Sequence, residues 1–166
     1  MTNTTIRTVS PTAPSTARNK RTAHPQIETP GPQAPGAKLL GLTDTTIDEL
    51  IESIARGLPT ATLGKLSDSL GFNRQRVLEL TGISERSLNR RKQHARLSPA
   101  ESERTARLAR VTERVHQLMG AETGNRWLNS HWPALNHKTP LEYAQSDLGA
   151  ELVIDLIGAL EDGIFV

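Results

Sequence analysis

Apolar residues recur at three- and four-residue intervals through most of the chain after Asp44. This spacing places them on one face of a helix, so it predicts a series of amphipathic helices. The first two helices are separated by Pro59 and end at Gly57 and Gly71. Their apolar positions are Ile47, Leu50, Ile51 and Ile54 in the first and Leu63, Leu66 and Leu70 in the second. No segment alternates between apolar and polar residues for long enough to predict a strand, so we expect an all-α fold.

Capping residues indicate where the helices of the middle region begin. Helices are expected over residues 73–80 and 84–94, because asparagine and serine are favourable N-caps at these two starts. Ser-Pro-Ala-Glu at 98–101 is a capping box with proline at the first helical position, and it predicts a long helix to about Met119. The apolar face of this long helix carries Leu108, Val111, Val115 and Leu118.

Glycines and prolines divide the last third of the chain into three further helices. A short helix is expected after Gly124, ending before Pro133, and a second should start at the pair 139–140, Thr-Pro. The final helix is predicted over residues 147–162, with Gly163 placed to end it. The first of these helices carries Trp127 and Leu128. One side of the final helix carries Leu148, Leu152, Val153, Leu156, Ile157 and Leu160.

Charge is strongly segregated along the chain. Counting Asp, Glu, Lys and Arg, the net charge is +4 in residues 1–38, −3 in 39–73, +6 in 74–114 and −5 in 120–166. A basic middle and an acidic end indicate two different partners. The alternative, that these charges only solvate helix faces, stays open at this point.

Composition limits the class of protein. Residues 1–37 hold six of the ten prolines and almost no large apolar side chains, so we expect residues 1–38 to form a disordered tail. The absence of cysteine excludes disulfides, thiolate metal sites and a cysteine nucleophile. No apolar run approaches the roughly 18 residues that span a bilayer, and the N-terminus lacks an apolar signal segment. We therefore expect a cytoplasmic protein with no membrane partner.

Residues 74–93 have the pattern of a helix-turn-helix, in which a tight turn holds two short helices at a fixed angle. Gly82 permits the turn, and the inward residues are Val77, Leu78, Ile83 and Leu88. Leu78 occupies a position where this motif usually has a small residue, so the angle between the two helices stays open.

The second helix of this motif is almost entirely polar around Leu88. Arginine can donate two hydrogen bonds to guanine, asparagine can pair with adenine, and lysine or arginine can neutralise phosphates. The residues expected to reach base edges are Arg86, Ser87, Asn89 and Arg90, and those expected near the DNA backbone are Gln75, Arg76, Arg91 and Lys92. An ordinary solvated helical hairpin remains the alternative.

A set of short motifs follows in one order between Leu80 and the C-terminus. They are Gly82-Ile83-Ser84, Leu97-Ser98-Pro99, Trp127-Leu128, Pro133-Ala134-Leu135, Thr139-Pro140-Leu141, Gly149 and Glu161-Asp162-Gly163. In this order and spacing the chain resembles the Xre/MbcA/ParS family of antitoxins, which are the partners of RES-domain toxins.

The resemblance implies both an architecture and a function. Residues 39–119 would form an Xre-like helix-turn-helix domain that dimerises and binds operator DNA to repress its own operon. Residues 120–166 would form a toxin-binding domain that obstructs the active site of the toxin, so that the homodimer is part of a larger toxin–antitoxin complex. RES toxins consume NAD, so NAD would be the substrate of the toxin and not a cofactor of this chain.

The chain ends in three apolar residues after Gly163, and two acidic residues precede this glycine. An apolar hook with flanking acids can fill a cation-lined pocket, such as one that binds the phosphates of NAD. The residues expected to contact the toxin are Trp127, Glu161, Asp162, Gly163, Ile164, Phe165 and Val166. The alternative is that the hook folds back on the protein's own core.

The sequence gives little support for a metal site or for an enzyme active site. His131 and His137 have neither a helical ligand spacing nor a nearby carboxylate pair, so no metal site is predicted. Asp147, Glu151 and Asp155 share one helix face, for which a solvated acidic surface is the default interpretation and toxin contact the alternative. Without a phosphate-binding loop or a catalytic triad order, we expect neither an enzyme nor a cofactor. A stand-alone helix-turn-helix transcription regulator is the competing hypothesis.

Overall fold

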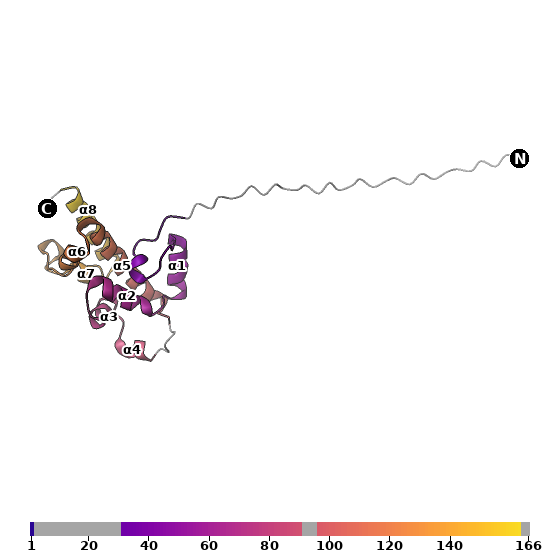
Figure 1. Ribbon diagram of the computed structural model, residues 1–166, viewed down its shortest axis with the longest axis horizontal. Helices are drawn as coiled ribbons and strands as arrows, with labels where there is room; N and C mark the ends of the chain where they lie inside the picture. Colours follow the sequence, from indigo (N-terminus) through magenta and orange to yellow (C-terminus); the bar gives the residue numbers. More distant parts are fainter. Residues whose placement is uncertain (2–30, 91–95, 164–166) are drawn as a thin grey trace.

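The fold is built around one long helix, against which most of the others pack (Figure 1). This computed structural model describes Met1 and residues 31–90 and 96–163. In those residues it contains eight α-helices, two short 3₁₀ helices and no strand beyond isolated bridges, which confirms the all-α class. The α-helices are α1 (Ile47–Arg56), α2 (Ala61–Leu70), α3 (Arg74–Thr81), α4 (Glu85–Asn89), α5 (Pro99–Met119), α6 (Ala121–Leu128), α7 (Pro140–Tyr143) and α8 (Asp147–Glu161).

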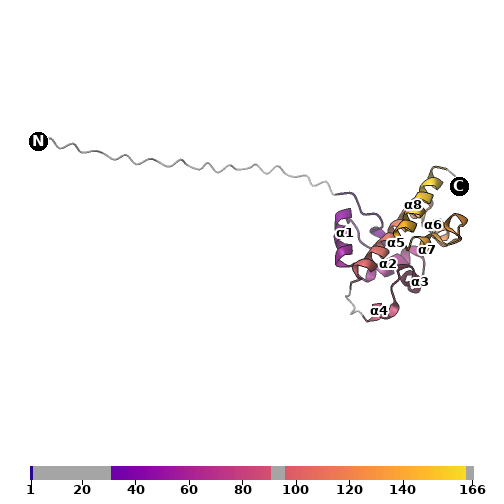
Figure 2. The ribbon, with the colours of Figure 1, turned by 180° about the vertical axis from the view of Figure 1, so that it is seen from behind.

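Helix α5 is the centre of the molecule. It packs against α1, α2 and α3 on the N-terminal side and against α6 and α8 on the C-terminal side. Leu108, Val111 and Val115 are fully buried, as their shared helical face predicts. Both ribbon views place α4 and the C-terminal end of α8 at opposite ends of the molecule, with α5 between them (Figures 1 and 2).

The capping residues begin the helices where the sequence predicts. Ser98 accepts a hydrogen bond from the Glu101 amide, and the Glu101 carboxylate accepts one from the Ser98 amide, which completes the expected capping box of α5. The side chains of Asn73 and Ser84 cap α3 and α4. Helix α4 ends at Asn89, and residues 91–95, where we expected it to continue, lie outside the described part of the chain.

The segment just before α1 is packed, although we expected residues up to 38 to belong to the tail. Ala34 and Ala37 are buried, and the Gly36 amide donates to the Glu113 carboxylate at 2.6 Å. A Cβ atom on Gly36 would lie only 2.6 Å from the Arg110 amide, so glycine is needed for this close approach to α5. Small residues therefore allow residues 34–37 of the proline-rich segment to pack against the fold. Residues 2–30 of the expected tail lie outside the described part of the chain.

We expected Gly124 to precede a helix, but it lies inside α6. The chain turns instead at Gly120, which has a φ of 75°. A Cβ atom on Gly124 would lie 3.0 Å from side-chain atoms of Val115 and His116 on α5. The glycine is thus a point of close contact between two helices rather than a helix break.

The apolar stripes of the first and last helices are only partly covered, which their periodicity did not predict. In α1, Leu50 is buried but Ile47 and Ile51 are 39% and 59% exposed. In α8, Val153 and Ile157 are fully buried while Leu148 and Leu152 are 69% and 45% exposed. Each apolar arc is wider than the neighbouring helices can cover.

Among the described residues, no helix is long and apolar enough to cross a bilayer.

Candidate functional site

Two short helices, α3 and α4, are joined by the predicted tight turn. Gly82 has a φ of 63° and donates its amide to the carbonyl groups of Leu78 and Glu79, which ends α3. The Ile83 amide also donates to the Leu78 carbonyl, at 2.9 Å. Val77, Leu78, Ile83 and Leu88 are all buried, as the helix-turn-helix pattern requires. The two helices are therefore held by a shared apolar contact and a hydrogen-bonded turn.

Helix α5 braces this motif from outside. The Arg104 guanidinium donates to the Thr81 carbonyl at 2.5 Å, and the Thr81 hydroxyl donates to the Val77 carbonyl at 2.8 Å. The Arg104 bond satisfies the carbonyl group of the last residue of α3, which lacks a partner within the helix. Sequence reasoning missed Arg104, because nothing in the spacing between residues 81 and 104 indicates that they meet.

The outer surface of α4 is polar and basic. Arg86, Asn89 and Arg90 are exposed, whereas Ser87 is half-buried. Gln75 on α3 is also exposed, and its amide lies 3.4 Å from the Glu79 carboxylate. The other two residues predicted to contact DNA, Arg91 and Lys92, lie outside the described residues. The arrangement leaves the side chains of Arg86, Asn89 and the C-cap residue Arg90 exposed to a ligand.

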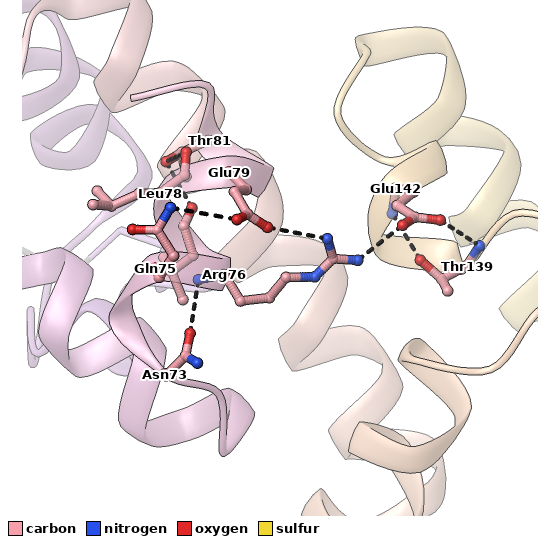
Figure 3. A network of polar contacts seen from close by, with 9 residues as sticks. Asn73, Gln75, Arg76, Leu78, Glu79, Thr81, Thr139 and Glu142 are labelled. Carbon is pink, nitrogen blue, oxygen red and sulfur yellow. Dashed lines mark hydrogen bonds and ion pairs between the residues drawn. The ribbon is translucent and has the colours of Figure 1, made fainter. Parts of the chain in front are cut away.

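Arg76 has a different environment from the residues of α4. Its guanidinium donates to the Glu142 carboxylate of α7 at 2.8 Å and to Glu79 at 3.4 Å (Figure 3). Glu142 also accepts from the Thr139 amide in the capping box of α7. A contact between Arg76 and a DNA backbone stays a prediction, and it would require at least a rearrangement of this ion pair.

The ion pair shifts the proton affinity of both partners. The hydrogen bond from Arg76, followed by the bond from the Thr139 amide, lowers the pKa of Glu142 below its ordinary value. The hydrogen bond to Glu142 raises the pKa of Arg76. Both side chains are about one-third exposed, so solvent screens much of this interaction. Both groups are charged at neutral pH.

Helix α8, the last helix of the described chain, presents a mixed apolar and acidic surface. The exposed Leu148 and Leu152 lie beside the exposed Glu151 and Asp155. Asp147, at the first position of the helix, forms an ion pair with the buried Arg107 of α5. The predicted acidic face is therefore present, and it is interleaved with leucines.

The residues predicted to bind a toxin have several environments. Trp127 is only 7% exposed and packs against Trp132, with their ring centroids 5.7 Å apart. Glu161 forms an ion pair with Arg114 of α5, while Asp162 and Gly163 are exposed. Residues 164–166, the predicted hook, lie outside the described part of the chain. In this state Trp127 offers little surface to a partner, which leaves the end of α8 as the accessible part of the prediction.

Comparisons with known proteins match both ends of this arrangement. Residues 49–110 match the model of the antitoxin Xre-like helix-turn-helix domain, and residues 114–163 match the antitoxin Xre/MbcA/ParS C-terminal toxin-binding domain. A protein of Yersinia enterocolitica named Antitoxin Xre is 34% identical over 129 residues, covering 76% of this chain and 87% of that protein. The chain belongs to the Xre antitoxin family.

A second relative, also named Antitoxin Xre, comes from Photorhabdus laumondii and is 27% identical over 130 residues. The match covers 76% of this chain and 88% of that protein. The resemblance inferred from the short sequence motifs is thereby confirmed. Neither of the two matched domain models is described as an enzyme.

The two matched segments divide the Xre-family fold within α5. The helix-turn-helix segment contains most of α1 and all of α2, α3 and α4, and the toxin-binding segment contains α6, α7 and α8. The Arg76–Glu142 pair joins the two segments across 66 residues of sequence. Among the described residues, no cluster of three or more histidine, aspartate or glutamate side chains could hold a metal ion.

Proposed function

We propose that this chain is the antitoxin of a type II toxin–antitoxin system, and that its partner is a RES-domain toxin that consumes NAD. The supporting observation is that one chain contains both a helix-turn-helix domain and a toxin-binding domain of the Xre family. Neutralisation works by occlusion of the toxin's active site, and NAD is a substrate of the toxin alone. The antitoxin itself acts in the cytoplasm without a cofactor and without catalysing a reaction.

The DNA-binding part of the proposal rests on α4. Its exposed Arg86 and Asn89, and Arg90 at its C-cap, are the residue types that read guanine and adenine in the major groove. A homodimer formed by residues 39–119 presents two such helices to two operator half-sites. Binding there represses the operon that encodes the toxin and the antitoxin.

The toxin-binding part of the proposal rests on residues 120–166. This segment carries a net charge of −5 and ends in the apolar sequence Ile-Phe-Val. An acidic, apolar end complements a pocket that binds the phosphates of NAD, because such pockets are lined by cations and by apolar walls. Insertion of residues 161–166 excludes NAD from the toxin.

Co-expression with the product of the neighbouring gene tests the proposal. The neighbouring protein alone should stop growth and deplete cellular NAD, and co-expression of this chain should restore both and yield a stable complex. Absence of toxicity together with absence of a complex would contradict the antitoxin function. The helix-turn-helix would then favour a stand-alone transcription regulator, for which DNase footprinting of its own promoter is the direct assay.

A further inference from the structure

Helix α8 has a wide apolar arc, and the described part of the protein covers only one side of it. Val153 and Ile157 point into the core against α5 and α7 and are fully buried. Leu148 and Leu152, one helical turn apart, are 69% and 45% exposed. One exposed leucine is ordinary on a protein surface, but two adjacent ones on a single helix form a local apolar ridge.

This ridge stands on a firmly held helix. At its start, the buried Arg107 of α5 forms an ion pair with Asp147 and donates to the Gln145 carbonyl at 2.9 Å. At its end, Glu161 forms an ion pair with Arg114 of α5. A helix fixed at both ends loses little conformational freedom when a partner binds, so its exposed side chains are preorganised for docking.

A shallow hollow adjoins the ridge. It has a volume of about 220 Å³, and its lining includes Lys138, Tyr143, Leu148 and Leu152. Gly149 shapes the floor, since a Cβ atom there would lie 1.9 Å from the Tyr143 carbonyl oxygen. Glycine therefore brings the end of α7 against the start of α8. The result is a ridge of two leucines beside a concave surface that a protruding side chain of a partner can fill.

Acidic residues flank the two leucines on the same side of α8. With 3.6 residues per turn, positions 148, 151, 152 and 155 fall within one arc of the helix surface, and position 162 continues it. Glu151, Asp155 and Asp162 are exposed. The hook residues Ile164, Phe165 and Val166 follow this helix in the sequence. The apolar and acidic character of the proposed hook thus begins two to four turns earlier, on the helix itself.

We propose that Leu148 and Leu152 dock into an apolar groove of the toxin whose rim carries lysine or arginine side chains. The toxin is the occupant favoured here, because the ridge lies within residues 114–163, the toxin-binding match, and the hook follows the same helix in the sequence. The inference rests on the proposed function and extends it. The hook blocks the toxin's active site, and the leucine ridge supplies the affinity that holds it there. This is the helix-in-groove mode of recognition, in which residues at i and i+4 serve as anchors.

A double substitution tests the ridge in the full-length chain. Leu148→Ser with Leu152→Ser should raise the Kd for a catalytically inactive toxin by about 100-fold or more, because buried apolar anchors dominate the affinity of such interfaces. Titration calorimetry measures the Kd, and thermal unfolding confirms that the variant is folded. Since both leucines are exposed, the fold should tolerate the change.

The matched control is Ile47→Ser with Ile51→Ser on α1. This pair is also one turn apart and is 39% and 59% exposed, but it lies on α1, outside the toxin-binding match over residues 114–163. The control should change the Kd for toxin by less than about threefold. Unchanged binding of the α8 variant, or an equal loss in both variants, would overturn the proposal.

Different outcomes would contradict the proposed function and the leucine ridge. If the unmodified chain does not bind the neighbouring gene's product, the proposed function itself fails. If it binds and the α8 variant binds equally well, only the ridge is wrong, and the hook must carry the affinity.

Discussion

The outer surfaces of α4 and α8 differ in chemistry, and α4 and the C-terminal end of α8 lie at opposite ends of the molecule (Figures 1 and 2). In α4, polar and basic side chains surround a single apolar anchor, Leu88, which points inward. In α8, two leucines point outward between acidic residues. A polyanion suits the first surface, and an apolar groove with a cationic rim suits the second. Under the proposed function, DNA and the toxin bind different surfaces of the chain.

The largest effect is expected from deletion of residues 164–166. Without the hook, the toxin's active site stays open, so the deletion variant should fail to restore growth even when it is expressed at the level of the unmodified chain. Because the leucine ridge is retained, the variant should still co-purify with the inactive toxin. Full rescue by the deletion variant would show that the hook does not block the active site.

The next largest effect concerns α4. Arg90→Ala removes a side chain expected to donate two hydrogen bonds to a guanine, so operator affinity should fall by about 1–3 kcal/mol. Binding to the toxin should be unchanged. Electrophoretic mobility shift at fixed salt measures the effect, since affinity for DNA depends strongly on ionic strength.

Arg56→Ala is the control for Arg90→Ala. Arg56 is an exposed arginine at the end of α1, so its loss changes the net charge equally without touching α4. The control should retain nearly full operator affinity. An equal loss in both variants would mean that net charge, and not a base contact, explains the effect of Arg90.

A smaller effect is expected from the acids beside the leucine ridge. Glu151→Gln with Asp155→Asn should lower the association rate with the toxin several-fold at low salt and very little at high salt, because exposed charges steer the encounter. Stopped-flow measurement at two ionic strengths checks this. Asp48→Asn with Glu52→Gln on α1 is the matched control. If the association rate does not depend on salt in either variant, the toxin groove does not have the proposed cationic rim.

The smallest effect concerns the ion pair that joins the two segments. Glu142→Gln should lower the free energy of unfolding by less than about 1 kcal/mol at pH 7, since the pair is partly solvated. The folded-state pKa of Glu142 is lowered, so the pair stabilises the fold above the pKa of glutamate in the unfolded chain. This stabilisation is lost as the pH falls through the lower folded-state value.

Urea unfolding at several pH values measures this dependence. The difference between the unmodified chain and Glu142→Gln should shrink below about pH 4. Glu122→Gln, a change at an exposed glutamate of α6, provides the comparison. A difference that grows toward low pH would show that Arg76 and Glu142 do not form a stabilising pair.

The sequence predicted where helices begin better than which of their faces are covered. Asn73, Ser84 and Ser98 start helices through local hydrogen bonds, and local bonds can be inferred from neighbouring residues. Whether Leu148 is buried depends instead on whether another helix lies over it. Periodicity groups residues on one face and says nothing about the width of the neighbour that covers it.

The sequence alone also did not predict the contacts between residues that are far apart in the chain. Arg76 has the residue type and sequence position expected of a DNA-backbone contact. Its pairing with Glu142 depends instead on how α7 packs beside α3. Gly124 reads as a helix break, although it is a contact point between α5 and α6. Both differences arise from tertiary packing, which overrides the local preference of single residues.

The most direct test of two separate surfaces is a set of four binding measurements on the full-length chain. The Leu148→Ser, Leu152→Ser double variant and the Arg90→Ala variant are each titrated with inactive toxin and with operator DNA. If the two surfaces are separate, the first variant loses toxin binding and keeps DNA binding, and the second does the reverse. Loss of both ligands by either folded variant would contradict this separation.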